Sequence, residues 1–212
     1  MSEDAEAELA ELVRSRAFER AATRALDSYG DEVYGFLINM LGSESDAAEV
    51  FGQVVEDIWK GLPSFAAKCT LRTWVYVIAR HAASRYRRTP WNRRDQRTGS
   101  AQLDELVART RTRTHPWQRT DVKDRFAQLR EALDPEDRAL LVLRVDRGMA
   151  WPEIARVTLD ADEPDERAIA RETDRLAKRF QRLKEELRRR AREAGLLDDD
   201  AKDRGTRGDG RR

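Results

Sequence analysis

Apolar residues recur at helical spacing in three consecutive series in the first half of the chain. Residues three or four positions apart share one face of an α-helix, so each series predicts a helix that buries one side. The first series ends at Gly42, the second at Pro63 and the third before Pro90, and residues 43–46 supply capping side chains ahead of the second. The members are Leu26, Tyr29, Val33, Phe36, Leu37, Met40 and Leu41; Ala47, Val50, Phe51, Val54, Val55, Ile58, Trp59 and Leu62; and Leu71, Trp74, Val75, Ile78, Ala82 and Tyr86.

A second group of helices is predicted in the C-terminal half. Asp134 and Pro135 form a strong helix start, because an aspartate N-cap and a first-turn proline both suit a helix N-terminus. Gly148 is the expected stop of this helix. A short helix should follow over 152–157, and one long amphipathic helix over 166–194.

Residues 89–121 lose the apolar periodicity, with a short helical piece expected over 103–107, and therefore predict a linker. The expected fold is all-α, with two small helical domains joined by a flexible linker. The boundaries we expect are an acidic N-terminal extension over 1–20, one helical domain over 21–88, the linker over 89–121, a second helical domain over 122–197 and a disordered tail over 198–212.

Composition indicates the cellular compartment in which the protein works. Cys69 is the single cysteine, so no disulfide framework can form and a reducing compartment is the default. No apolar run approaches the ~20 residues of a membrane span. The acidic start of the chain is the opposite of a signal peptide. We therefore expect a cytoplasmic protein.

The sequence argues against an enzyme. His81 and His115 are the only histidines, and neither has neighbours that resemble a metal site or an activated nucleophile. The chain has no glycine-rich phosphate loop. Cys69 is expected to be a small core or loop residue. We accordingly expect no catalytic residue, metal, cofactor or small-molecule substrate.

The third predicted helix carries a basic surface with an aromatic ring in it. Net charge is only +1, so the overall balance is uninformative, but residues 80–94 contain no acid. A merely solvated helix face usually interleaves both signs. Arginines follow a phosphate backbone and aromatic rings stack on unpaired bases, which favours contact with nucleic acid. One stripe holds Arg72, Tyr76, Arg80 and Arg87, and the adjacent one His81, Arg85 and Arg88.

The long C-terminal helix has two possible uses. The pair of shorter helices around Gly148, with Ala155 where backbones approach, resembles the first part of a helix-turn-helix. The long helix could then enter a major groove. Its apolar spacing of three and four equally suits a coiled coil or a bundle. Its inner face holds Ile169, Leu176, Phe180, Leu183 and Leu187, and its outer stripe Arg171, Arg175, Lys178, Arg182 and Arg189.

In this order, the motifs resemble the extracytoplasmic-function sigma factors of bacterial RNA polymerase. Residues 26–88 resemble the promoter-opening domain of that family, region 2, and the C-terminal half resembles region 4. The first resemblance rests on DEVYGF (31–36), AAEV (47–50), Trp59, GLPSF (61–65), WVYVIAR (74–80) and the pair Arg87-Arg88. The second rests on LDPEDR (133–138), LLVLR (140–144), EIA (153–155) and the spacing of Leu176, Arg179, Arg182 and Leu187.

The resemblance implies that core RNA polymerase and promoter DNA are the partners, and it admits an anti-sigma factor as a further one. The second helix would dock on the clamp coiled coil of the largest polymerase subunit through Glu49, Gln53, Glu56 and Asp57. The third helix would capture and unpair the minus-ten element through Arg72, Trp74, Tyr76, Arg80, His81, Arg85, Arg87 and Arg88. Region 4 would read the minus-thirty-five element through Arg171, Arg175, Lys178, Arg179 and Arg182.

The chain departs from the family at several positions. Glu49 stands where Asp is usual, His81 replaces a frequent Asn, and Arg85 a frequent Asp, so a minus-ten base preference is not implied. Ala150 occupies the usual N-cap of the scaffold helix. An acidic insertion over 160–170 precedes the recognition segment. It either loops away from DNA and lengthens the turn, which we favour, or restrains promoter binding.

Two other functions explain parts of the pattern. A stand-alone helix-turn-helix regulator would use the C-terminal half and leave residues 26–88 without a role. A helical protein-interaction module would use the long helix and leave the acid-free run 80–94 without one. Neither would need core polymerase.

Overall fold

A computed structural model describes residues 3–88, 128–159 and 164–197. All regular elements in these residues are helices, which confirms the all-α prediction. The expected linker 89–121, its helical piece at 103–107 and the tail 198–212 lie outside the described residues. Within the described part of the chain, no helix combines the length and the apolar character needed to cross a membrane.

The three helices predicted in the first half are present, and their ends follow local signals. Helix α2 (Phe18–Leu41) ends at Gly42, whose φ of 69° is left-handed and suits glycine. Helix α3 (Glu44–Gly61) begins at Ser43, whose side chain accepts a hydrogen bond from the backbone N–H of Asp46. A 3₁₀ turn, η1 (Leu62–Ser64), and a short loop lead to helix α4 (Leu71–Arg88).

A further helix, α1 (Glu3–Arg14), lies in what the sequence indicated only as an acidic extension. Leu9 is fully buried, and Leu12 and Val13 pack against the core. Full burial of one leucine is worth about 1.5–3 kcal/mol. The spacing of these residues, i, i+3 and i+4, is the signal that would have predicted the helix.

The C-terminal part contains α7 (Pro135–Leu141), a five-residue π-helix η2 (Val142–Asp146), α8 (Trp151–Thr158) and α9 (Glu166–Glu193). The expected starts are confirmed, because the carboxylates of Asp134 and Asp165 cap α7 and α9 by accepting backbone hydrogen bonds. Ala150 precedes α8 without a side-chain acceptor. Glu153 instead accepts from the Ala150 N–H at 2.9 Å.

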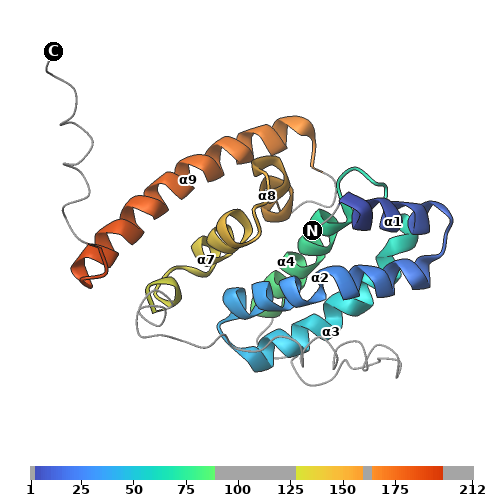
Figure 1. Cartoon of the computed structure of the whole chain (residues 1–212), viewed down its shortest axis with the longest axis horizontal. Coiled ribbons are helices and arrows are strands. Elements are labelled where there is room, and N and C mark those ends of the chain that lie inside the picture. The colour runs from blue at the N-terminus through green and yellow to red at the C-terminus, as the bar shows by residue number, and fades with distance from the viewer. Residues whose placement is uncertain (1–2, 89–127, 160–163, 198–212) are drawn as a thin grey trace, which may run out of the picture.

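The two helical groups pack against each other. Helices α7 and α8 lie between the long α9 and the group α1–α4 (Figure 1), with α7 against α2 and α8 against α4. Buried side chains from both groups form one continuous hydrophobic cluster. The domain boundaries expected from the sequence remain a prediction, since the segment that would separate the domains is outside the described residues.

Candidate nucleic-acid interface

The start of α4 is fixed by a carboxylate from α1. Glu6 accepts hydrogen bonds from the backbone N–H groups of Leu71 (3.2 Å) and Arg72 (3.1 Å). The hydroxyl of Tyr29 donates to the same carboxylate at 2.5 Å. An acid at a helix N-terminus satisfies free N–H groups and interacts favourably with the helix dipole. α1 therefore sets where the basic helix α4 begins.

Glu32, on α2, organises the first turns of α4. The guanidinium of Arg72 donates to one oxygen of Glu32 from Nε (3.1 Å) and Nη2 (2.8 Å), and the hydroxyl of Tyr76 donates to that oxygen at 3.2 Å. Burial, followed by the charge of Glu32, raises the pKa of the Tyr76 hydroxyl well above its ordinary value. Arg72 also donates to the carbonyl of Arg147 at 3.2 Å.

The position of Tyr76 differs from the one expected from the sequence. The sequence placed its ring on an exposed stripe with Arg72, Arg80 and Arg87, yet Tyr76 is fully buried and packs edge-on against Phe36 at a centroid distance of 5.3 Å. The reason is that α4 packs against α2, α3 and α8, so its buried face is wider than one amphipathic stripe. In this arrangement the ring is not available to stack on a base.

The remaining arginines of the stripe face an acid on α7. Arg80 lies 2.8 Å from Glu136 through Nη2 and donates to it at 3.1 Å through Nη1, and the Arg80 side chain is only 15% exposed. Arg87, further along α4, lies 3.5 Å from the same carboxylate. The run 80–94 has no acid of its own, but the fold brings Glu136 to it. In the sequence, Glu136 stands out only as part of the motif LDPEDR (133–138).

The other residues expected at the minus-ten element contact different neighbours and do not form one site. Trp74 is partly buried, with its ring 5.1 Å from that of Phe65. Its indole lies so close to Gly61 that a Cβ there would meet it at 2.9 Å. His81 Nε2 lies 3.5 Å from the carbonyl oxygen of Leu159. Arg85 pairs with Asp57 on α3, and Arg88 is exposed.

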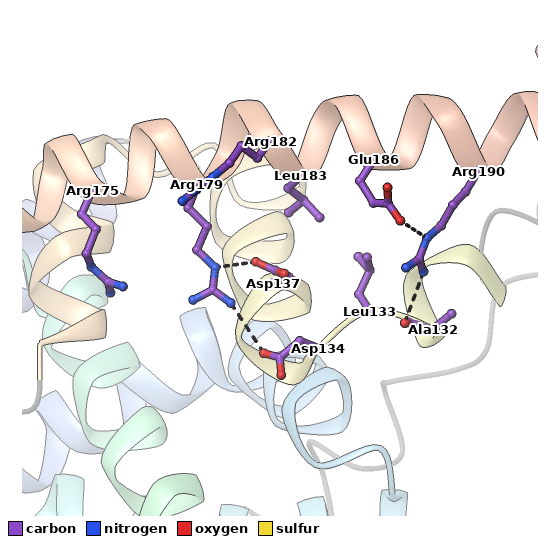
Figure 2. A pocket seen from close by; sticks show the side chains of 10 residues that line it. All are labelled: Ala132, Leu133, Asp134, Asp137, Arg175, Arg179, Arg182, Leu183, Glu186 and Arg190. Carbon is purple, nitrogen blue, oxygen red and sulfur yellow. Dashed lines mark hydrogen bonds and ion pairs between the residues drawn. The ribbon is translucent and has the colours of Figure 1, made fainter.

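Two of the α9 arginines expected to contact DNA form ion pairs. Arg175 is paired with Glu172 on its own helix at 2.6 Å, and Arg179 reaches the α7 carboxylates Asp137 (2.5 Å) and Asp134 (3.6 Å). These arginines line an open groove between α9 and the start of α7 (Figure 2). The exposed cations on this helix include Arg171, Lys178 and Arg182.

The face expected to bind polymerase lies on α3. Glu49 and Gln53 are partly exposed. Gln53 donates to Asp57 at 2.8 Å, while Lys60 pairs with Glu56. Asp57 also receives Arg85, so this acidic face and α4 are linked through one carboxylate. These residues lie on the side of α3 opposite its buried residues.

Residues 25–93 match the family model Sigma-70 region 2. The match begins in α2 and includes α3, η1 and α4, which are the elements that carry the acidic face and the basic stripe. No curated protein matches the chain. The matched part of the chain is therefore similar to region 2 of the sigma-70 family.

Proposed function

We propose that the chain is a sigma factor of the extracytoplasmic-function type, which binds core RNA polymerase and directs it to a class of promoters. The observation that carries the proposal is the match of residues 25–93 to Sigma-70 region 2. The matched residues include the whole of helix α4. This helix bears five arginines, Arg72, Arg80, Arg85, Arg87 and Arg88. The protein would supply recognition, and the chemistry of RNA synthesis would belong to the polymerase.

Each helix has a role in this proposal. The face of α3 with Glu49, Gln53, Glu56 and Asp57 would bind the polymerase clamp. The arginines of α4 would hold the backbone of the opened minus-ten strand, because guanidinium groups neutralise phosphates and release counterions.

The C-terminal part would read the minus-thirty-five element. The pair α8 and α9 has the order of a helix-turn-helix, and the exposed cations Arg171, Lys178 and Arg182 give α9 a surface for phosphate or base contacts. The resemblance implies an acidic insertion over 160–170 ahead of the recognition segment, so the angle at which α9 would meet DNA is a prediction.

Run-off transcription by core polymerase, with and without the protein, tests the proposal beside DNA binding by the protein alone. A sigma factor gives promoter-specific transcripts only with core polymerase. DNA binding that is sequence-specific without polymerase, and no gain in transcripts, would instead identify a stand-alone helix-turn-helix regulator. The absence of both would leave a protein-interaction module and reject the proposal.

A further inference from the structure

Gly52 lies in the middle of helix α3, and nothing inside the chain explains why this position has no side chain. Glycine destabilises a helix interior relative to alanine, because it loses more conformational freedom on folding. A Cβ added at Gly52 would meet no atom within 4 Å among the described residues. By contrast, a Cβ at Gly61, the last residue of the same helix, would meet the Trp74 indole at 2.9 Å. The fold therefore requires Gly61 but does not require Gly52.

Gly52 leaves a gap between side chains on the face of α3 that carries Glu49, Gln53 and Glu56. Residues three or four positions apart are neighbours on a helix surface, so Glu49 and Glu56 border the gap on its two sides. Glu56 already pairs with Lys60. Glu49 makes no ion pair in the part of the chain that the structure describes. The gap therefore lies beside a carboxylate that is free to accept a cation from a partner.

A missing side chain on a helix surface allows a second helix to come closer. The axes of packed helices are about 8–10 Å apart, and the side chains at the contact set the distance. Glycine suits positions where another backbone approaches closely. The resemblance to sigma factors implies that α3 docks on the clamp coiled coil of the largest polymerase subunit, which consists of helices. A helix that crosses α3 at Gly52 would bring its own cations within reach of Glu49.

We propose that Gly52 is the point of closest approach between α3 and core polymerase, and that its lack of a side chain sets the affinity of this contact. The inference rests on the proposed function, because the partner is core polymerase. Glycine weakens the helix in the free chain, and its benefit appears only in the complex. Any side chain at position 52 would hold the partner helix away from α3 and weaken its pairing with Glu49.

Two measurements on Gly52→Ala separate binding from folding. Urea denaturation followed by circular dichroism should give a higher midpoint than the wild type, because alanine suits a helix interior and its Cβ has open space. Fluorescence anisotropy with labelled protein should show an affinity for core polymerase that is lower by roughly fivefold or more, because the added atom overfills a tight contact. Gly52→Gln, with a longer side chain, should bind core polymerase more weakly still.

Ala10→Gln is the matched control, because it adds a glutamine side chain at an exposed position on α1, which packs on α2 and α4. It should leave the affinity for core polymerase unchanged. A double-mutant cycle then tests the link to Glu49. Combining Gly52→Gln with Glu49→Gln should cost less affinity than the sum of the two single changes, because a displaced partner helix no longer reaches Glu49.

Wild-type affinity for core polymerase in folded Gly52→Ala and Gly52→Gln would overturn the inference. A lower urea midpoint in Gly52→Ala would also overturn it, because the fold itself would then require glycine. Additive losses in the cycle would overturn the pairing with Glu49. Run-off transcription with the wild-type chain tests the sigma assignment separately. Promoter-specific transcripts together with unchanged Gly52 variants would reject only the inference, whereas a wild-type chain that neither binds core polymerase nor yields transcripts would reject the proposed function.

Discussion

Carboxylates that lie far from α4 in the sequence hold its polar side chains. Glu6 caps the helix, Glu32 holds Arg72 and the Tyr76 hydroxyl, and Glu136 holds Arg80. Each acid comes from a different helix. The orientation of the arginines on α4 is therefore a property of the whole fold, and the acids can be tested one at a time.

Glu6→Ala should lower the free energy of unfolding by about 1.5–3 kcal/mol, because it removes charged hydrogen bonds to Leu71, Arg72 and Tyr29. The measurement is urea denaturation followed by circular dichroism. Glu8→Ala is the matched control on the same helix, since Glu8 makes an exposed pair with Arg24 that should contribute about 0.2–1 kcal/mol at most. Equal losses in both variants would show that Glu6 does not cap α4.

Tyr29 and Tyr76 should make the fold sensitive to alkali. Burial, then the hydrogen bond to Glu6, raises the Tyr29 pKa, and burial and Glu32 raise the Tyr76 pKa, both above the ordinary 10.0. The folded state keeps these protons while the unfolded chain releases them near pH 10. Stability should thus be full below that pH and fall as pH rises above it. Near-ultraviolet absorbance should show both tyrosinates forming only together with unfolding, and non-cooperative ionisation would contradict this.

At the scale of single elements, α4 is proposed to hold a DNA strand. Replacing both Arg80 and Arg87 by Ala should lower the yield of open promoter complex. The slope of log affinity against log salt should shrink by about 0.7 for each phosphate of the single strand that the variant no longer neutralises. Permanganate footprinting and a salt series measure the two effects. A footprint and a salt slope equal to those of the wild type would limit Arg80 and Arg87 to a structural role as partners of Glu136.

The face of α3 is proposed to bind polymerase. Replacing Glu49 and Glu56 by Lys reverses charge on this face while the buried side of α3 stays intact, so affinity for core polymerase should fall at least tenfold, or about 1.4 kcal/mol. Glu19→Lys, at an exposed position at the start of α2, is the control for added charge. Fluorescence anisotropy with labelled protein gives the affinities. Unchanged binding by the double variant would remove this face from the proposal.

At the scale of the whole molecule, the two helical groups share one hydrophobic cluster although a long segment separates them in the sequence. Limited proteolysis should cut first within residues 89–121, where few apolar residues are available for burial. The two fragments should then elute together in size-exclusion chromatography, because α7 and α8 pack on α2 and α4. Protection of residues 89–121 from cleavage would contradict the predicted linker. Separate elution of the fragments would contradict stable packing between the two helical groups.

The sequence by itself determined α2, α3, α4, α7, α8 and α9 and most of their ends, whereas α1 was expected only as an acidic extension. Ser43 and Asp134 cap α3 and α7 as the local pattern predicts, Gly42 ends α2 as expected, and α9 begins at the expected residue, 166. Periodicity and capping act over three or four residues, so they can be read directly from neighbouring positions. The acid-free basic run and the ordered motifs that resemble those of sigma factors are likewise properties of the linear chain.

Only the tertiary structure decided what surrounds that basic run. Arg80 and Glu136 are 56 positions apart, and Thr73 and Glu153 are 80 apart. No local signal pairs such residues, because their contact depends on how α7 and α8 pack against α2 and α4. The same packing buries Tyr76, which periodicity placed on the surface. Helix periodicity reports one buried face, whereas α4 is covered by neighbours on several sides, and long-range packing alone determines how many.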